Sequence, residues 1–219
     1  MRLVRQLSTR GLALTAALFV SGYPLFVVAA NVAQRDTYKP ASEAMSNLAL
    51  GRDGWLMTLA FLSLGAGNLL MAILVRRLVP RTIAGPALLT ASACTTLLSA
   101  VFQTDADGAP STLHGTVHIA LGLSSFTLVI ASMTACGIAY LRSRRYRRVG
   151  IASLIWAGLE LGSIVLTFAL PDSLFGIGQR IILAVAISWL LTMCVIALRA
   201  SAPSNVTAGA PVPSFGPAR

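Results

Sequence analysis

The stretch GIGQRIILAVAISWLLTMCVIAL, residues 176–198, decides the fold because it is long and apolar and carries a single charged side chain, Arg180. A helix of about 20 residues, at roughly 1.5 Å each, covers the hydrocarbon core of a membrane. Five other runs have the same character: residues 12–33, 54–75, 83–102, 113–141 and 149–170. Strands of a barrel would alternate in polarity over about 10 residues. The sequence therefore predicts one all-α bundle of six membrane-spanning helices over residues 12–198.

The composition agrees with lipid as the solvent of this chain. Of its 219 residues, 56% are hydrophobic and 11% are charged, and the mean hydropathy is +0.77. These values lie outside the ordinary range of soluble domains. The net charge of +10 would also suit a nucleic-acid-binding protein, but no basic module with interleaved aromatic residues is present. We therefore expect membrane lipids as partners and no nucleic acid.

The distribution of basic residues predicts the orientation, since short loops rich in arginine and lysine stay in the cytoplasm. One side of the bundle would hold 13 of the 17 basic residues: Arg2, Arg5, Arg10, Arg76, Arg77, Arg81, Arg142, Arg144, Arg145, Arg147, Arg148, Arg199 and Arg219. Both termini are therefore expected in the cytoplasm, with the protein in the cell membrane. Residues 1–11 would form a basic N-terminus, and the proline-rich residues 199–219 a disordered tail.

The first apolar run could instead be a secretory signal peptide. Basic Arg2 and Arg5 precede it, and residues 28–30, Val-Ala-Ala, resemble a cleavage site. Its apolar part is longer than the roughly 7 to 15 residues usual in such peptides. We therefore expect the run to be retained as a helix, whereas cleavage would leave five helices.

One acidic residue, Glu160, lies half-way along the run 149–170. A carboxylate at that depth costs about 2.5–3.5 kcal/mol, so Glu160 must be neutral or paired. The helical repeat places four other side chains on its face: Ser153, Trp156, Ser163 and Thr167. Gly158 and Gly162 form a GxxxG pair on the opposite face, which favours close packing with a neighbour or a homodimer.

Other predicted helices also carry polar stripes. The intramembrane polar side chains include Asn68, Ser92, Thr96, Ser99, Ser125, Ser132, Ser188 and Thr192. Two interpretations are open. The hydroxyls could bond to carbonyls one turn back and hold helices together, as is common in membrane bundles. They could instead line one shared polar chamber, and the buried Glu160 favours this second interpretation.

The segment FQTDADGAPSTLHGTVH, residues 102–118, contains both histidines of the chain. His114 and His118 are four residues apart, so a helix would place them on one face, and Asp105 precedes them by a short loop. Three such ligands could hold zinc with one open position. The alternative is that these side chains cap the helix. Arg180, which the charge pattern puts on the same side of the membrane, completes the candidate functional cluster.

Four short motifs resemble a known family: SNLALGRDGW at 46–55, VFQTD at 101–105, LHGTVHIALG at 113–122 and GIGQR at 176–180. Their order and spacing are similar to those of the bacterial six-helix membrane proteins grouped as domain of unknown function 998. The family pattern Phe-Pro-Thr-Asp, followed by His-Gly-x-x-His, maps onto Phe102, Thr104, Asp105, His114, Gly115 and His118, with Gln103 in place of proline. The resemblance implies the fold and carries no established activity.

Three functions fit these observations. The first is binding or sensing of a lipid or small molecule in a polar chamber open to the outer face. The second is a membrane-embedded hydrolase that uses zinc held by Asp105, His114 and His118. The third is a proton-coupled transporter with Glu160 as the proton carrier. An enzyme is the less favoured interpretation, because Glu160 lies about 15 Å, half the core thickness, below the histidines.

Overall fold

The computed structural model describes residues 8–78 and 82–201. In this part of the chain, six α-helices run back and forth: α2 (Thr9–Ala33), α3 (Trp55–Leu78), α4 (Ala84–Ser99), α5 (Leu113–Leu141), α6 (Arg147–Ala169) and α7 (Phe175–Ala200). Three short 3-10 helices lie in the connections: η1 (Met45–Ala49), η2 (Arg144–Tyr146) and η3 (Asp172–Leu174). Most of the predicted basic N-terminus, residues 1–7, and of the predicted tail, residues 202–219, lies outside the described residues.

Five of these helices are long and apolar enough to cross a membrane, and α4 is a shorter apolar helix between two of them. Within the predicted run 83–102 the helix ends at Ser99, and just beyond it Ala100 and Val101 donate their backbone N–H groups to carbonyls three residues back. This tightens the last turn. The 16 residues of α4 rise about 24 Å. The chain is therefore an all-α integral membrane protein, as its sequence predicts.

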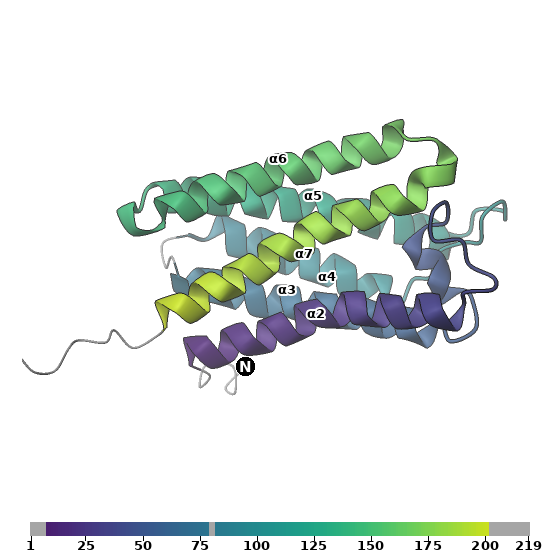
Figure 1. Cartoon of the computed structure of the whole chain (residues 1–219), viewed down its shortest axis with the longest axis horizontal. Helices are drawn as coiled ribbons and strands as arrows, with labels where there is room; N and C mark the ends of the chain where they lie inside the picture. Colours follow the sequence, from purple (N-terminus) through teal and green to yellow (C-terminus); the bar gives the residue numbers. More distant parts are fainter. Residues whose placement is uncertain (1–7, 79–81, 202–219) are drawn as a thin grey trace, which may run out of the picture.

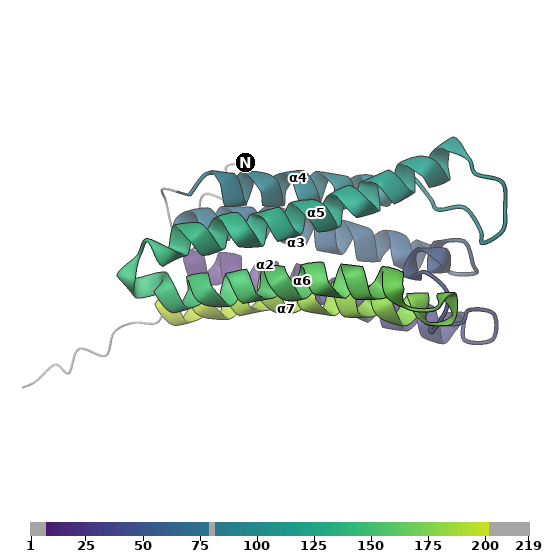
Figure 2. The ribbon, with the colours of Figure 1, turned by 90° about the horizontal axis from the view of Figure 1, so that it is seen from above.

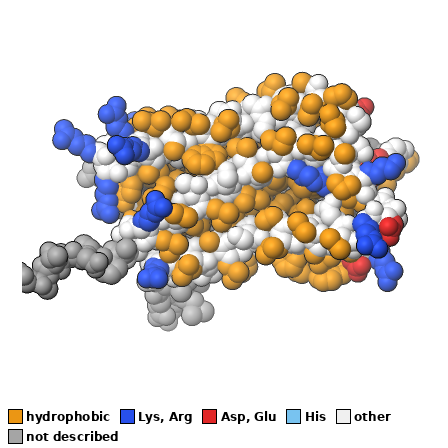
Figure 3. Space-filling view, viewed as in Figure 1, with side chains coloured by type: hydrophobic (Ala, Val, Ile, Leu, Met, Phe, Trp, Pro, Cys, Tyr) orange, Lys and Arg blue, Asp and Glu red, His pale blue; other side chains and the backbone are white. Residues whose placement is uncertain are grey.

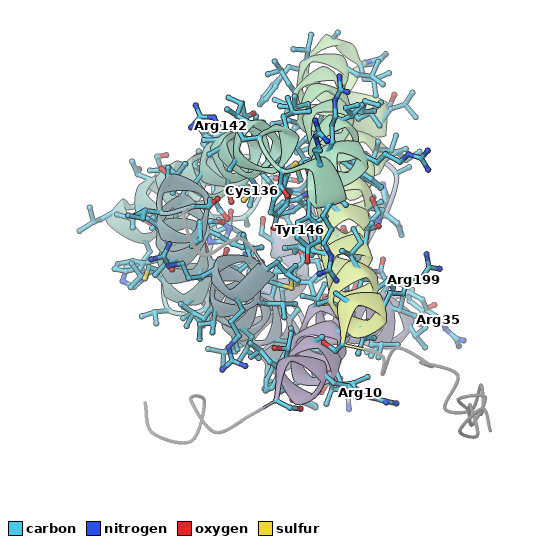
Figure 4. The ribbon with its side chains drawn as sticks, turned by 90° about the vertical axis from the view of Figure 1, so that its left-hand side faces the viewer. Arg10, Arg35, Cys136, Arg142, Tyr146 and Arg199 are labelled. Carbon is cyan, nitrogen blue, oxygen red and sulfur yellow. The ribbon has the colours of Figure 1, made fainter. Side chains whose placement is uncertain are left out.

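The helices form a ring in chain order. Each helix packs against the one before it and the one after it, and α7 closes the ring against α2 (Figures 1 and 2). Helix α3 also contacts α7 across the ring. Figure 4 shows this ring from one end, with Cys136 toward its centre and Arg10, Arg142 and Arg199 around its outside.

The α6 helix shows most clearly how the bundle is packed. Beyond the arginines at its start, the large side chains that it exposes are apolar: Ile151, Ile155, Leu159, Leu161, Val165, Leu166 and Phe168. Those that it buries are small or polar: Gly150, Ser153, Ala157, Glu160, Ser163 and Thr167. In water this distribution would be unfavourable, whereas in lipid it places the apolar surface against the acyl chains. The inward polar face agrees with the stripe that the sequence predicts.

Neighbouring helices meet through hydroxyls and glycines, as is common in membranes. Ser63 Oγ of α3 donates to the Phe19 carbonyl of α2 at 2.7 Å, and Ser132 Oγ of α5 donates to the Gly85 carbonyl of α4 at 2.9 Å. Trp189 of α7 donates to Ser153 Oγ of α6 at 3.1 Å. These bonds satisfy polar groups inside the bundle where no bulk water reaches them.

On the face that Figure 3 shows, the charged side chains gather toward the two ends of the bundle, and many apolar side chains lie between them. We call the end that holds the start of α2 and the end of α7 the basic end, because nine of its described side chains are arginines: Arg10, Arg76, Arg77, Arg142, Arg144, Arg145, Arg147, Arg148 and Arg199. The opposite end, the loop end, carries residues 34–54, 100–112 and 170–174.

A glycine contact at the basic end holds α5 against α6. A Cβ atom at Gly150 would lie 2.7 Å from the Leu141 nitrogen and 2.8 Å from the Gly137 oxygen, and these backbone atoms cannot give way. We predict that Gly150→Ala lowers the free energy of unfolding by about 1–3 kcal/mol. Gly158→Ala is the matched control on the same helix, because its Cβ would meet no atom within 4 Å. It should be neutral or stabilising by at most about 1 kcal/mol.

The measurement is reversible unfolding of both variants in mixed detergent micelles, followed by circular dichroism. Equal destabilisation by the two substitutions would contradict the close approach of α5 and α6.

Candidate functional site

The loop before α5 forms a cap for that helix. Thr112 Oγ1 accepts from the Gly115 N–H at 3.1 Å, as an N-cap residue does. The Asp105 carboxylate in turn accepts from the Thr112 hydroxyl at 2.6 Å and from the Thr112 N–H at 2.8 Å. The two hydrogen bonds, that from the hydroxyl first, hold the pKa of Asp105 below its ordinary value. Asp105 therefore acts here as the support of a helix cap.

The two histidines contact different parts of Phe102. His118 is buried, and its Nδ1 lies 2.7 Å from the carbonyl oxygen of Phe102. His114 is exposed, and its ring packs on the Phe102 ring at 5.3 Å between centroids. In the described part of the chain, no three His, Cys, Asp or Glu side chains lie close enough together to hold a metal ion. The predicted zinc cluster of Asp105, His114 and His118 is therefore not assembled, because Asp105 caps α5 through Thr112 while the two histidines contact the carbonyl and the ring of Phe102.

Arg180 also lies apart from this group, although the sequence analysis placed it in the same cluster. Its guanidinium donates to four oxygens, which belong to Asn31, Tyr38, Pro40 and Gly176 at 2.7–3.2 Å. Burial raises the pKa of Tyr38, although Arg180 opposes this effect, so its hydroxyl stays protonated beside the arginine. Arg180 therefore fastens the first connection of the loop end to the start of α7.

A polar cavity of about 70 Å³ lies inside the loop-end half of the ring. Its polar lining residues come from four helices and η1: Tyr23, Ser46, Thr96, Ser99, His118, Ser125 and Gln179. This volume holds a few water molecules or a small polar group. No arginine, lysine or acid lines it, so the cavity offers hydrogen bonds without a full charge.

His118 presents a defined group to this cavity. A carbonyl oxygen can only accept, so Nδ1 of His118 carries the proton that it donates to Phe102. In the neutral ring Nε2 is then an acceptor, and among the described residues it has no hydrogen-bond partner. Gln179 accepts from the Met45 N–H through Oε1 at 2.6 Å, which leaves its amide N–H groups as donors. The cavity therefore combines an acceptor with donors.

A larger groove of about 530 Å³ opens beside this cavity, and we call it the lateral groove. Its apolar walls are Ile119, Leu123 and Phe126 of α5, Ile164 and Phe168 of α6, and Phe175 and Ile182 of α7. Figure 2 shows why the groove exists, since α5 and α6 lie together near the basic end and move apart toward the loop end. Asn47, Asp105 and Asp107 line its loop end, so the groove is apolar along the helices and polar at its mouth.

The cavity and the lateral groove share Ser46, Gly122, Phe126 and Gln179 in their walls. Gly122 matters most for their connection, because a Cβ atom there would meet no atom within 4 Å. A larger side chain at this position would fill the space between the two. The sequence offers a weak signal for Ser46, Gly122 and Gln179, which belong to the motifs SNLALGRDGW, LHGTVHIALG and GIGQR, and none for Tyr23 as a cavity residue.

The hydroxyl groups predicted to lie on the polar helix faces take two kinds of position, between helices and in cavity walls. Ser125 Oγ lies 3.1 Å from Ser92 Oγ and 2.9 Å from Thr96 Oγ1, and it also lines the polar cavity. Ser132 contacts α4 away from the cavity, and Ser163 donates to the Glu160 carbonyl at 2.8 Å. Thr167 lines the lateral groove. Hydroxyls that join helices and hydroxyls that line a chamber therefore occur side by side, so both sequence interpretations apply in part.

Glu160 is fully buried, and neither of its carboxyl oxygens has a hydrogen-bond partner among the described residues. The same is true of the Asn68 side-chain oxygen on α3. A charged carboxylate without a partner at this depth is costly, so the site requires either a protonated, neutral carboxyl or a bound cation. Gly158 and Gly162 face away from the bundle, with open space at both. A homodimer through them stays a prediction.

Comparison with known proteins identifies a family. The model of the family described as "Protein of unknown function (DUF998)" matches residues 12–196, which include all six α-helices but the first residues of α2 and the last of α7. No curated protein and no solved structure matches the chain. The family description assigns no activity, so the geometry of the loop-end half must supply any functional argument.

The cap of α5 makes a prediction about acid stability. The pKa of Asp105 is lowered from 3.8 in the folded chain, so its contribution is complete above that value and is lost as the pH falls through the folded pKa. Asp105→Asn should therefore have a lower Tm than the unchanged chain at pH 6, and this difference should shrink only below about pH 3.8. Thr112→Val removes the hydroxyl donor and should flatten the same pH dependence. A Tm difference that stays constant from neutral pH to strong acid would contradict this role.

Proposed function

We propose that this chain, which belongs to the DUF998 family of proteins of unknown function, binds a lipid or another small amphiphile in the polar cavity and the lateral groove. One observation carries the proposal: a groove with apolar walls and a polar mouth shares its wall with a cavity whose polar groups offer hydrogen bonds without a full charge. Ligand sites in proteins commonly combine an apolar lining with a few placed polar groups. An amphiphile matches both parts at once.

The two parts of the site suit different parts of such a ligand. An acyl or isoprenoid chain would lie between α5 and α6, against Leu123, Phe126 and Phe168. A neutral polar group would enter past Gly122 and bond to His118 Nε2 and to Gln179. A cationic or hydroxyl-bearing group would suit the mouth, where Asp105 and Asp107 lie. An anionic head would be repelled there.

The arginine distribution supports an orientation for this site. With the basic end in the cytoplasm, as the positive-inside tendency favours, the lateral groove opens into the outer leaflet of the cell membrane. The ligand would then enter sideways from lipid, between two helices, without crossing water. Zinc hydrolysis has no comparable support, because the described side chains form no metal group.

A second candidate function rests on Glu160. A buried carboxyl with two unpartnered oxygens is typical of proton relays in membrane pumps and transporters. A transporter would then couple movement of the bound amphiphile to proton transfer at Glu160. A Glu160→Gln variant should lose proton-coupled uptake of the amphiphile into vesicles while it still binds the amphiphile. Unchanged uptake would rule out the transporter function.

Gly122 provides the sharpest test of the amphiphile site. The probe is oleoyl lysophosphatidylcholine, which has one acyl chain, a cationic choline and no net charge. Gly122→Leu should weaken its binding by at least about tenfold, because the leucine fills the space between cavity and groove. Gly158→Leu makes the same exchange in open space on the outer face of α6 and should bind the probe normally. Isothermal calorimetry of the full chain in detergent measures both.

His118 tests the polar part of the site separately. In His118→Asn, the amide can still donate to Phe102, while the acceptor that faces the cavity is lost. Binding of the same probe should weaken by about fivefold, the size of one net hydrogen bond, with little change in Tm. Full binding by both Gly122→Leu and His118→Asn would overturn the proposal.

A further inference from the structure

We propose that a second groove, between α2 and α7, binds an anionic phospholipid through Arg180 and Arg35. This site is separate from the amphiphile site above and lies on the other side of α7. The groove has a volume of about 750 Å³. Its apolar walls are Pro24, Val27, Val28 and Val32 of α2, and Leu183, Ala184, Ile187 and Leu191 of α7.

The groove has a cationic head at the loop end. Asn31, Arg35 and Arg180 line it there, just above the apolar walls. A phospholipid has the same order of parts, with a phosphate above two acyl chains. Figure 3 shows this face of the bundle, where apolar side chains run between charged groups at the two ends. The walls therefore lie where the acyl chains of a membrane lipid already are.

The charge of Arg180 is the argument for an anionic occupant. Its four hydrogen bonds go to two carbonyls, an amide oxygen and a tyrosine hydroxyl, none of which is negatively charged. Nε has no partner among the described residues. An arginine at a membrane interface is usually paired with an acid or a phosphate, and in the described chain no carboxylate lies within salt-bridge distance of Arg180. A lipid phosphate would supply the missing charge.

Arg35 adds a second positive charge at the mouth. It follows the end of α2 and is exposed, and its ion pair with Asp36 is long, at 3.7 Å between Nε and Oδ1. Exposed pairs of this kind contribute little, so the Arg35 guanidinium is free to turn toward a phosphate. Two arginines with apolar walls below them favour an anionic phospholipid over a zwitterionic one, because a choline would place a third positive charge beside them.

The occupant also has a structural role in this proposal. Arg180 fastens the connection after α2 to α7 through Tyr38 and Pro40, and Tyr23, Met45 and Leu183 line both this groove and the polar cavity. A lipid bound here would brace the wall of the cavity from outside. The amphiphile site could fail its own tests without affecting this lipid site, since neither Gly122 nor His118 lines the α2/α7 groove.

The test titrates the full chain carrying Gly122→Leu, which closes the amphiphile site to choline lipids, in dodecyl maltoside, with dioleoyl phosphatidylglycerol, dioleoyl phosphatidylcholine or inorganic phosphate while Tm is measured. Phosphatidylglycerol should raise Tm with saturation, and the other two should have little effect at the same concentrations. Arg35→Gln should raise the phosphatidylglycerol concentration at half-saturation about fivefold, which is the effect of one basic residue near an anionic lipid. Arg52→Gln, an exposed arginine at the same end, is the matched control and should leave it unchanged.

Two tryptophan substitutions test the binding of the lipid chains separately from the recognition of charge. Ala184→Trp should weaken phosphatidylglycerol binding at least tenfold, because the indole occupies the groove between α2 and α7. Ala29→Trp places the same side chain at an exposed α2 position outside the groove and should bind normally. Arg180→Gln should abolish the preference for phosphatidylglycerol, and its Tm without lipid reports on folding.

Three results would overturn the proposal. Equal Tm shifts from both phospholipids would mean that the lipid is held without charge recognition. An equal shift from inorganic phosphate would indicate a free anion instead of a lipid. Normal phosphatidylglycerol binding by Ala184→Trp would place the lipid elsewhere on the protein.

Discussion

The structure depends on one constraint: a polar group in the hydrocarbon core has no water to bond with, so the bundle itself must satisfy it. The helices meet this constraint by turning their small and polar faces inward. Ser132 reaches the Gly85 carbonyl, and Trp189 reaches Ser153. The apolar side chains of α6 face outward into lipid. Glu160 is an exception, because its oxygens have no partner among the described residues, and so is the Asn68 side-chain oxygen.

The two ends of the bundle differ in how closely α5 and α6 pack. Near the basic end, glycines bring α5 and α6 into backbone contact, as Gly137 and Gly150 do. Toward the loop end these helices move apart, and the gap becomes the lateral groove. Arg180 and Gln179 of α7 bond to the connection between α2 and α3. This connection forms the wall of the polar cavity at the loop end. The loop-end half is therefore the part of the bundle that holds the polar cavity and the lateral groove.

The candidate site could be predicted only in part. Helical periodicity correctly places His114 and His118 on one helix and Asp105 near them, yet the spacing does not determine which atoms they contact. Asp105 accepts a hydrogen bond from Thr112, and His118 donates one to the backbone carbonyl of Phe102. A carbonyl partner leaves no signature in the side-chain pattern. Tyr23 and Gln179 were missed for another reason, because their position in the cavity wall depends on helices that are distant in sequence.

By itself, the sequence determined the helices, their approximate bounds and the inward face of α6, because hydrophobic length and the 3.6-residue repeat act locally along the chain. It did not foresee the short α4, whose last turn tightens at Ser99. The tertiary structure alone decided that Arg180 faces the first connection, that both histidines contact Phe102, and that grooves open on both sides of α7. These features depend on how far apart packed helices lie, and that distance is a property of side chains from several segments at once.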